Sequence, residues 1–142
     1  MTKLHVTQQE IGHAFRMHRK FYEITDGSRH PPGPPAMSRR LILCYAVECG
    51  LKHKLMRDRN LKDTKQVEEA VGLHHDLGRY IKEARLSADL ALSAIQAMKT
   101  PPCRPSRHVQ PSQLHEAFRY GVELAQEAHL VEQLKRVLKV CE

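Results

Sequence analysis

The sequence of 142 residues contains no tryptophan, and aromatic residues of all kinds make up only 5% of it. Sheets are usually rich in aromatic and β-branched residues, whereas leucine, alanine, glutamate, lysine and arginine, which are plentiful here, are good helix formers. The length is that of one ordinary domain with one core. We therefore predict a single all-α domain over residues 1–142.

Long apolar segments are also missing. No apolar run approaches the eighteen or so residues of a membrane span, and the first residues, MTKLHVTQQEIGHAF, lack the continuous apolar core of a signal peptide. The cysteines show neither a CxxC pair nor a regular disulfide spacing, so we expect reduced thiols at Cys44, Cys49, Cys103 and Cys141. From these absences we expect a cytoplasmic protein with no membrane partner.

Missing motifs argue against several kinds of site. The chain has ten histidines, but it lacks HExxH, a Cys/His zinc spacing and a histidine–carboxylate cluster on one face. Its seven glycines are scattered, so there is no glycine-rich phosphate loop, and there is no G-x-S-x-G elbow. We expect neither a metal site nor a cofactor.

Basic residues are in excess. The formal net charge is +7 and the isoelectric point is about 9.4. Such a charge favours an acidic partner, nucleic acid or a nucleotide first, and it is also compatible with simple solubility.

Helical periodicity covers most of the chain. Thr7 and Glu10 have the spacing of a capping box, which predicts the start of an amphipathic helix that ends near Asp26. Further helices are predicted over residues 38–57, 67–73, 77–84, 87–98 and 112–141, and Gly72 is expected to stop the second of these. Prolines exclude helix from two loops, 27–37 and 100–111. The expected architecture is an up-and-down bundle of about five helices.

The helix predicted over 38–57 is the most apolar run of the chain, yet Glu48 and Lys52 fall inside its apolar stripe. The apolar members of that stripe are Leu41, Cys44, Tyr45, Leu55 and Met56. Because an unpaired buried charge costs several kcal/mol, these two residues are either a self-satisfied pair or part of a site. Arg39 and Arg40 lie at the start of the same helix, where the helix dipole disfavours cations. A bound anion would explain them, and so would simple exposure.

Two other polar pairs stand on the predicted helices: His75 with Asp76, and Arg119 with Tyr120. Metal-free cleavage of RNA needs a general base, a general acid and a cation that stabilises the phosphate in the transition state. His75 and Arg119 supply these chemical types, with Asp76 orienting the imidazole.

The same residues also fit a purely structural interpretation. Glu48 and Lys52 would tie their helix to His75 or Arg119 in a buried polar network. Asp76 would then be an N-cap, followed by the first packed leucine of the next helix.

Three segments in order resemble motifs of the HEPN superfamily: AVECGLKHKL, HHDLGRYI and HEAFRYGVE. Members of that family often show an AxECxLK-like helix, a GHDL-like helix start and an RY pair late in the domain, and the similarity covers residues 38–125. The resemblance implies a bundle of four or five helices, usually dimeric, that is found in toxin–antitoxin and antiviral systems and beside nucleotidyltransferases.

The resemblance also implies a chemistry. Many HEPN proteins are metal-independent endoribonucleases that carry Arg, four to six residues and then His, with the active site assembled across the dimer. This chain departs from that spacing, because three residues separate Arg104 from His108 and seven separate Arg107 from His115. Other HEPN domains only bind a ligand or act as scaffolds.

These observations lead us to expect a homodimeric, HEPN-like protein that binds RNA or a nucleotide and acts as an endoribonuclease of a toxin–antitoxin or defence system. The predicted catalytic residues are His75, Asp76 and Arg119. The predicted substrate-binding residues are Arg39, Arg40, Glu48, Lys52 and Tyr120. The alternatives are a non-catalytic subunit that docks a partner protein, such as an antitoxin or nucleotidyltransferase, and a small-molecule or nucleotide sensor that uses Arg39, Arg40 and the surroundings of Glu48.

Overall fold

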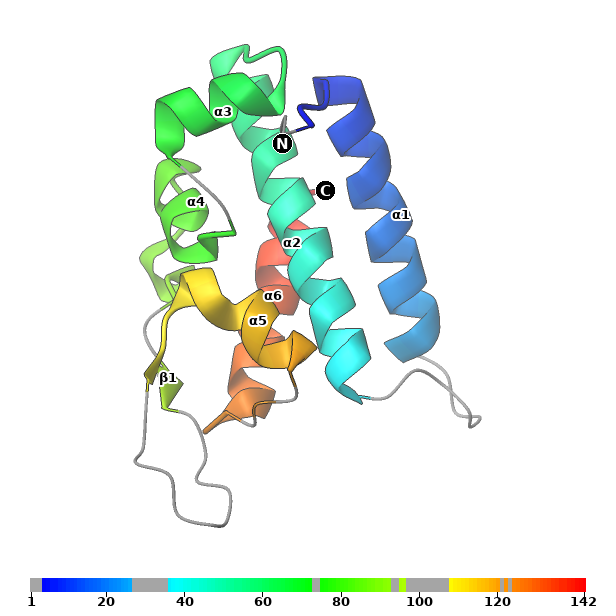
Figure 1. Ribbon diagram of the computed structural model, residues 1–142, viewed down its shortest axis with the longest axis vertical. Coiled ribbons are helices and arrows are strands. Elements are labelled where there is room, and N and C mark those ends of the chain that lie inside the picture. Colours follow the sequence, from blue (N-terminus) through cyan, green and yellow to red (C-terminus); the bar gives the residue numbers. More distant parts are fainter. Residues whose placement is uncertain are drawn as a thin grey trace.

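A computed structural model describes residues 4–26, 36–72, 75–92, 95–96, 108–120, 122 and 124–142. These residues are mainly helical, which confirms the all-α class (Figure 1). The α-helices are α1 (Gln8–Asp26), α2 (Ala36–Arg59), α3 (Thr64–Val71), α4 (Leu77–Glu83), α5 (Leu114–Arg119) and α6 (Glu127–Val140). Most of the two loops predicted over 27–37 and 100–111 lies outside the described residues.

Helix α2 is the centre of the fold, and every other α-helix contacts it. Leu43, Val47 and Leu51 are fully buried although they lie outside the apolar stripe that the sequence suggested. The prediction of one buried stripe was therefore too narrow, because α2 packs on more than one side. Although α2 is apolar, neither it nor any other helix in the described part of the chain has the length and hydropathy needed to cross a membrane.

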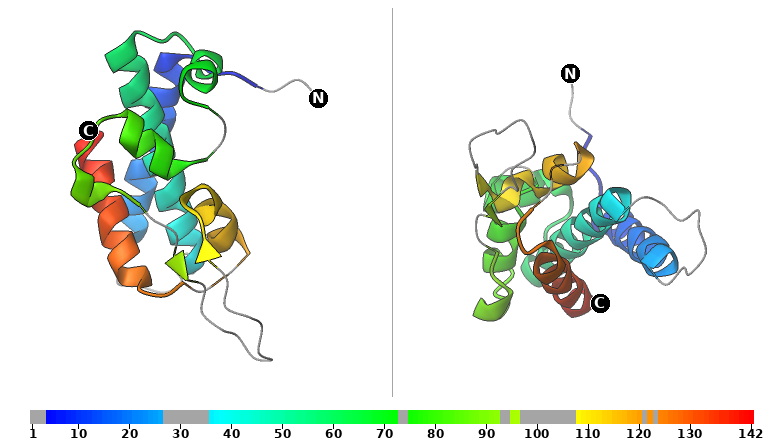
Figure 2. Two further views of the ribbon diagram at one scale, coloured as in Figure 1. Left: turned by 90° about the vertical axis from the view of Figure 1, so that its left-hand side faces the viewer. Right: turned by 90° about the horizontal axis from the view of Figure 1, so that it is seen from below.

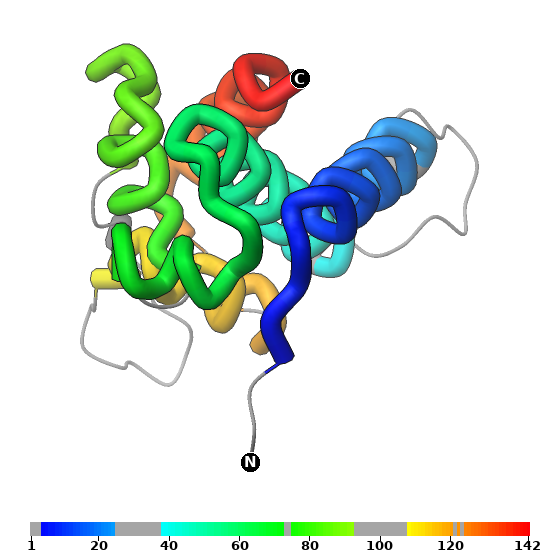
Figure 3. Tube along the Cα trace, turned by 90° about the horizontal axis from the view of Figure 1, so that it is seen from above, coloured from blue at the N-terminus to red at the C-terminus, as the bar shows by residue number. Residues whose placement is uncertain are grey.

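Helix α1 runs antiparallel to α2 and lies at the edge of the molecule (Figures 1 and 3). Arg19 Nη1 of α1 also pairs with Glu142 Oε1 at 3.4 Å, just beyond the end of α6. The predicted capping box is confirmed, since Thr7 N donates to Glu10 Oε1 at 3.1 Å and Glu10 N donates to Thr7 Oγ1 at 3.2 Å. Phe15 is buried against Gly50 of α2, where an added Cβ would come within 2.8 Å of the ring. One face of α1 thus packs on α2.

Helices α3 and α4 begin at aspartate caps. Asp63 accepts a hydrogen bond from Gln66 N at 3.0 Å, and Asp76 accepts one from Arg79 N at 3.2 Å. Gly72, with φ of +106°, ends α3 in a conformation that favours glycine. The predicted stop at Gly72 and the predicted helix start before Leu77 are both confirmed.

The helix predicted over 87–98 is wrong. In the described part of this segment, residues 87–92 and 95–96, the helix is replaced by a short 3₁₀ turn, η1 (Ala88–Leu90), and Ala91 is already extended. Ser87 makes no side-chain capping hydrogen bond, and Ile95–Gln96 (β1) pairs instead with His108–Val109 (β2) in an antiparallel ladder. A helix over residues 87–98 would be only marginally stable without a capping hydrogen bond, so the pairing of β1 with β2 is favoured over it.

The single helix predicted over 112–141 is also wrong. A 3₁₀ turn, η2 (Pro111–Gln113), leads into α5, and the chain then breaks before α6. Val122 N donates to Ala117 O at 2.8 Å, which is the 6→1 hydrogen bond of a Schellman ending, and Gln126 has a left-handed φ of 52°. The break allows α5 and α6 to pack on opposite sides of α2 (Figure 2).

Candidate functional site

A polar cluster forms where α2 meets the start of α4. Glu48 Oε1 lies 2.5 Å from His75 Nδ1 and 3.7 Å from Lys52 Nζ. Glu48 is only 7% exposed, so these two groups balance a charge inside the core. Burial acts to raise the pKa of Glu48, but the contact with His75 and the charges of Lys52, His75 and His115 outweigh it and lower the pKa. Glu48 is therefore ionised at neutral pH.

A second imidazole, from α5, stands against the first. The ring centroids of His75 and His115 are 4.1 Å apart, with 35° between the ring planes. The His75 side chain is 40% exposed and that of His115 is 12% exposed. Burial and then the charge of His75 lower the pKa of His115, and the nearby carboxylates of Glu116 and Glu48 only partly oppose this. His115 is therefore neutral at pH 7.

The backbone of His75 is unusual. Its φ is +55°, in the left-handed region that few residues other than glycine adopt. His75 comes immediately before the cap residue Asp76, so this turn brings the imidazole against Glu48 while α4 begins. Positive φ at a residue with a side chain costs free energy, and such conformations are often found at functional sites.

Arg119 joins the cluster through a tyrosine of α2. Its Nη2 donates to Tyr45 Oη at 3.0 Å, and Tyr45 lines the same small cavity as Glu48, His75 and His115. That cavity has a volume of about 10 Å³, enough for about one water molecule. Among the described residues, the inner side of the cluster therefore has no room for a larger ligand, and the exposed groups of the cluster are His75 and Arg119.

Two buried polar atoms beside the cluster have no hydrogen-bond partner within the described ranges: Tyr80 Oη and His115 Nδ1. Tyr80 is 1% exposed, and Lys52 Nζ lies 5.7 Å from the centroid of its ring. An unpaired buried polar group costs about 1–3 kcal/mol.

The structure brings together four of the predicted site residues: Glu48, Lys52, His75 and, through Tyr45, Arg119. Asp76 is the N-cap of α4, as the structural interpretation expected, and the carboxylate against His75 is that of Glu48.

The other three predicted residues lie outside the cluster. Arg40 Nη1 pairs with Glu127 Oε2 at 2.7 Å and ties α2 to α6. Eight residues of helix separate Arg40 from Glu48, a rise of about 12 Å, and Arg39 precedes it. Tyr120 is largely exposed and lines a different cavity, although its side chain also forms a hydrogen bond with that of Arg119 at the edge of the cluster.

The sequence reasoning did not select His115 or Tyr45 as site residues. One signal for His115 was present, because it precedes Arg119 by four residues and side chains with that spacing lie on the same face of a helix. No comparable signal exists for Tyr45, whose role depends on how α5 packs on α2.

The remaining reactive groups give no second site of the same kind. Among the described residues, no three histidine, cysteine, aspartate or glutamate side chains are grouped to hold a metal ion. Burial raises the pKa of Cys49 to about 11 and that of Cys141 to about 12, so both thiols are protonated and poor nucleophiles at neutral pH. Cys44 is buried as well, and burial raises its pKa further.

Comparison with protein-family models, with curated proteins and with solved structures gives no match to this chain. The resemblance to the HEPN superfamily therefore stays a prediction. What the site does must be argued from its own chemistry.

Proposed function

We propose that this chain is an HEPN-like RNA-binding protein that cleaves RNA without a metal ion. The observation that carries the proposal is the pair of imidazoles, His75 and His115, whose ring centroids are 4.1 Å apart. The carboxylate of Glu48 lies against His75, and Tyr45, which lines the same cavity, holds Arg119. The net charge of +7 favours a polyanionic substrate.

The two histidines would divide the acid and base work. His115, with its lowered pKa, accepts the proton of the ribose 2′-hydroxyl, and the 2′-oxygen attacks the adjacent phosphorus. His75 gives a proton to the departing 5′-oxygen, and the products are a 2′,3′-cyclic phosphate and a 5′-hydroxyl. Arg119 stabilises the negative charge on the phosphate oxygens as the fifth bond forms.

The surrounding residues hold these groups in place. Glu48 fixes His75 through Nδ1, which leaves Nε2 as the nitrogen that transfers the proton. Lys52 compensates the charge of Glu48 inside the core, and Tyr45 fixes Arg119. In this scheme the residues predicted from α2 position the catalytic groups and do not touch the reacting atoms.

The proposal is tested by RNA cleavage in the presence of a chelator. The substrates are several RNA types at low salt, and the variants are His75→Ala and His115→Ala. Loss of a general acid or base should lower the rate about 100-fold or more. The matched control is His129→Ala, since His129 is an exposed histidine of α6 outside the cluster. The proposal is wrong if both site variants cleave at the rate of the control.

The same proposal includes a homodimer joined through α1. Met17, Phe21 and Ile24 are 57%, 49% and 62% exposed and form one stripe, opposite the side of α1 that packs on α2. Beside this stripe lies a cavity of about 570 Å³, whose lining includes Val6, Gln9, Glu10, His13 and Met17. Three exposed apolar side chains next to a groove favour an interface.

Charge along α1 favours a second copy as the occupant. Suppose that the α1 helices of two copies pair antiparallel, with the two-fold axis passing near residue 15. Glu10 then lies opposite Lys20 of the second copy, and Phe21 lies opposite the groove at Gln9. The interface is then self-complementary, as a two-fold interface must be. Analytical ultracentrifugation should show a dimer that Phe21→Glu dissociates and Lys20→Glu weakens, with partial recovery in the double variant Glu10→Lys, Lys20→Glu. A wild-type monomer at high concentration contradicts the dimer.

The exposed stripe of α1 is also the observation that favours the alternative function, a non-catalytic subunit that docks a partner protein such as an antitoxin or nucleotidyltransferase. The two functions differ in two measurements. A monomer that cleaves no RNA, and whose α1 variants lose a co-purifying partner, supports the docking subunit. A dimer that cleaves RNA supports the endoribonuclease of a toxin–antitoxin or defence system.

A further inference from the structure

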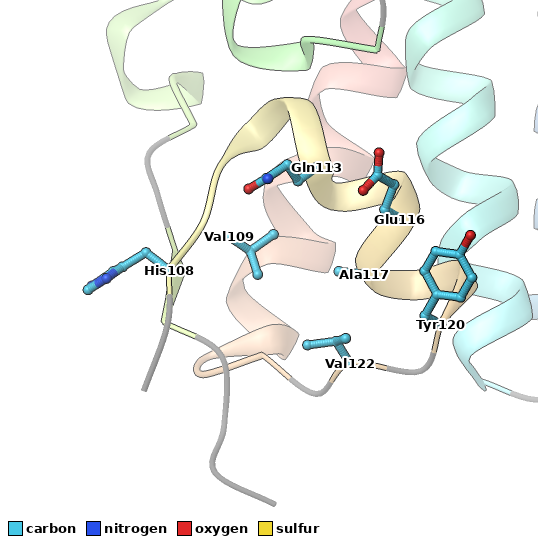
Figure 4. A pocket seen from close by; sticks show the side chains of 7 residues that line it. All are labelled: His108, Val109, Gln113, Glu116, Ala117, Tyr120 and Val122. Atoms are coloured by element: carbon cyan, nitrogen blue, oxygen red, sulfur yellow. The ribbon is translucent and has the colours of Figure 1, made fainter. Parts of the chain in front are cut away.

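A second cavity lies beside α5, on a different side of this helix from His115. Its volume is about 260 Å³ (Figure 4). Val109, Ala117 and Val122 form an apolar floor, and Gln113, Glu116 and Tyr120 stand along one rim. The side chain of His108 points away from the others.

The rim carries an aromatic residue that the packing does not explain. Tyr120, the C-cap of α5, is 73% exposed and forms a hydrogen bond with the side chain of Arg119, whereas Phe118, two residues earlier, is buried in the core. Large aromatic side chains are normally buried for most of their surface. An exposed ring at the edge of an apolar floor is a surface on which a flat base can stack.

The position of this cavity relative to the catalytic cluster is set by helical geometry. Gln113 and Tyr120 cap the two ends of α5, and with Glu116 they follow one stripe along it, at steps of three and four residues. His115 and Arg119 follow another stripe, roughly 100° away around the helix. A nucleotide that lies across α5 with its phosphate at His115 and Arg119 therefore has its base over the cavity.

The polar groups of the rim select among the bases. Gln113 Oε1 already accepts a hydrogen bond from Gln110 N at 3.0 Å, so the amide nitrogen is the group that Gln113 offers as a donor. Glu116, more than half exposed, offers a carboxylate that accepts two hydrogen bonds. Of the four RNA bases, only guanine has two adjacent donors, N1–H and the N2 amino group, on its pairing edge, next to an acceptor, O6.

We propose that this cavity binds a guanine base of the RNA beside the scissile phosphate, an inference that rests on the proposed function of the His75–His115 site. Tyr120 stacks on the base, Glu116 accepts from N1–H and the amino group, and Gln113 donates to O6. Single-stranded RNA is recognised in this way by stacking and by hydrogen bonds to exposed base edges.

The test is equilibrium binding of guanosine, adenosine, cytidine and uridine 5′-monophosphates to the full-length protein, followed by calorimetry. The wild type should bind the guanosine nucleotide about tenfold more tightly than the others, as expected for one bidentate contact. Glu116→Gln should remove this preference. Tyr120→Ala should lower the affinity for all four nucleotides about tenfold, whereas Tyr120→Phe should keep the wild-type affinities, since stacking needs only the ring.

The matched control is Glu132→Gln, because Glu132 is an exposed glutamate of α6 that pairs only with the nearby Lys135 among the contacts of the described residues. It should keep the guanosine preference. Equal affinity for the four nucleotides, no binding of the guanosine nucleotide at millimolar concentration, or a preference that survives Glu116→Gln would each overturn the guanine site. The assay contains no cleavage step, so failure of RNA cleavage is a separate result, and cleavage without guanine preference overturns the base site alone.

Discussion

The two ends of the Glu48 cluster lie in different surroundings. At the inner end, Glu48 and Tyr80 are 7% and 1% exposed and are packed among apolar side chains of the core. At the outer end, the His75 side chain is 40% exposed and Arg119 is exposed. Burial makes the inner end important for stability, whereas access makes the outer end available to a substrate. One connected set of polar side chains can therefore serve both purposes, and the substitutions below separate them.

The largest effect on stability is expected at the inner end. Glu48→Ala leaves Lys52 without its carboxylate and removes the contact to His75. Removing one partner of a buried ion pair costs about 3–5 kcal/mol, and we expect about 3 kcal/mol because Lys52 and His75 can reach solvent. Urea unfolding followed by circular dichroism measures this change. A loss below about 0.5 kcal/mol, typical of a surface substitution, would mean that the charge is not buried.

Lowering the pH should destabilise the protein in two successive ranges, first through His115 and then through Glu48. The lowered pKa of His115 means that the unfolded chain binds more protons than the folded chain below the ordinary value of 6.5, so stability falls as the pH drops from there through the lowered pKa. The lowered pKa of Glu48 gives a stabilisation that is complete above its ordinary value of 4.5 and is lost as the pH falls through the lowered pKa.

Urea unfolding at pH 7.5, 5.5 and 4 measures this dependence. His115→Asn should reduce the loss of stability between pH 7.5 and 5.5 and leave the lower range unchanged. A protein whose stability is constant or rises between pH 7.5 and 5.5 would not fit these pKa shifts.

A smaller effect on stability is expected at the outer end. Tyr45→Phe removes the hydrogen bond from Arg119, which should cost about 1 kcal/mol or less. If Tyr45 positions Arg119 for catalysis, RNA cleavage should fall by a larger factor, and Arg119→Ala should add little to the loss in the double variant. Independent, additive effects of the two substitutions on the cleavage rate would contradict this role for Tyr45.

The smallest effect is expected at Tyr80, although it is deeply buried. Its hydroxyl has no hydrogen-bond partner in the part of the chain that the structure describes. Tyr80→Phe should therefore change the free energy of unfolding by less than about 0.5 kcal/mol, or stabilise the protein slightly, because no hydrogen bond is lost. A loss above about 1 kcal/mol in urea unfolding would show that the hydroxyl has a partner, such as a buried water.

The sequence predicted those features that depend on neighbours along the chain. The cap at Thr7 and Glu10, the stop at Gly72 and the start before Leu77 follow from local hydrogen bonding and backbone conformation, and they are present. Glu48 attracted attention because a charge in an apolar stripe requires partners, and the structure supplies them.

The features that were not predicted from the sequence depend on packing between distant segments. The strand pairing of Ile95 with Val109 replaces a predicted helix, and nothing local to either segment indicates the other. The hydrogen bond from Val122 to Ala117 ends α5 in the middle of a pattern that remains apolar on one face. His115 reaches His75 only because this short α5 packs on α2, so the spacing of His115 from Arg119 indicated a shared helix face but not the contact with His75.

The central claim is that the imidazoles of His75 and His115 perform metal-free chemistry on RNA. It is tested most directly by incubating the wild-type protein, with a chelator, with a guanine-containing RNA and with the same sequence made of 2′-deoxynucleotides, and by identifying the product ends. The account predicts cleavage of the RNA alone, with 2′,3′-cyclic phosphate ends. No cleavage of the RNA, or equal cleavage of both strands, would contradict it.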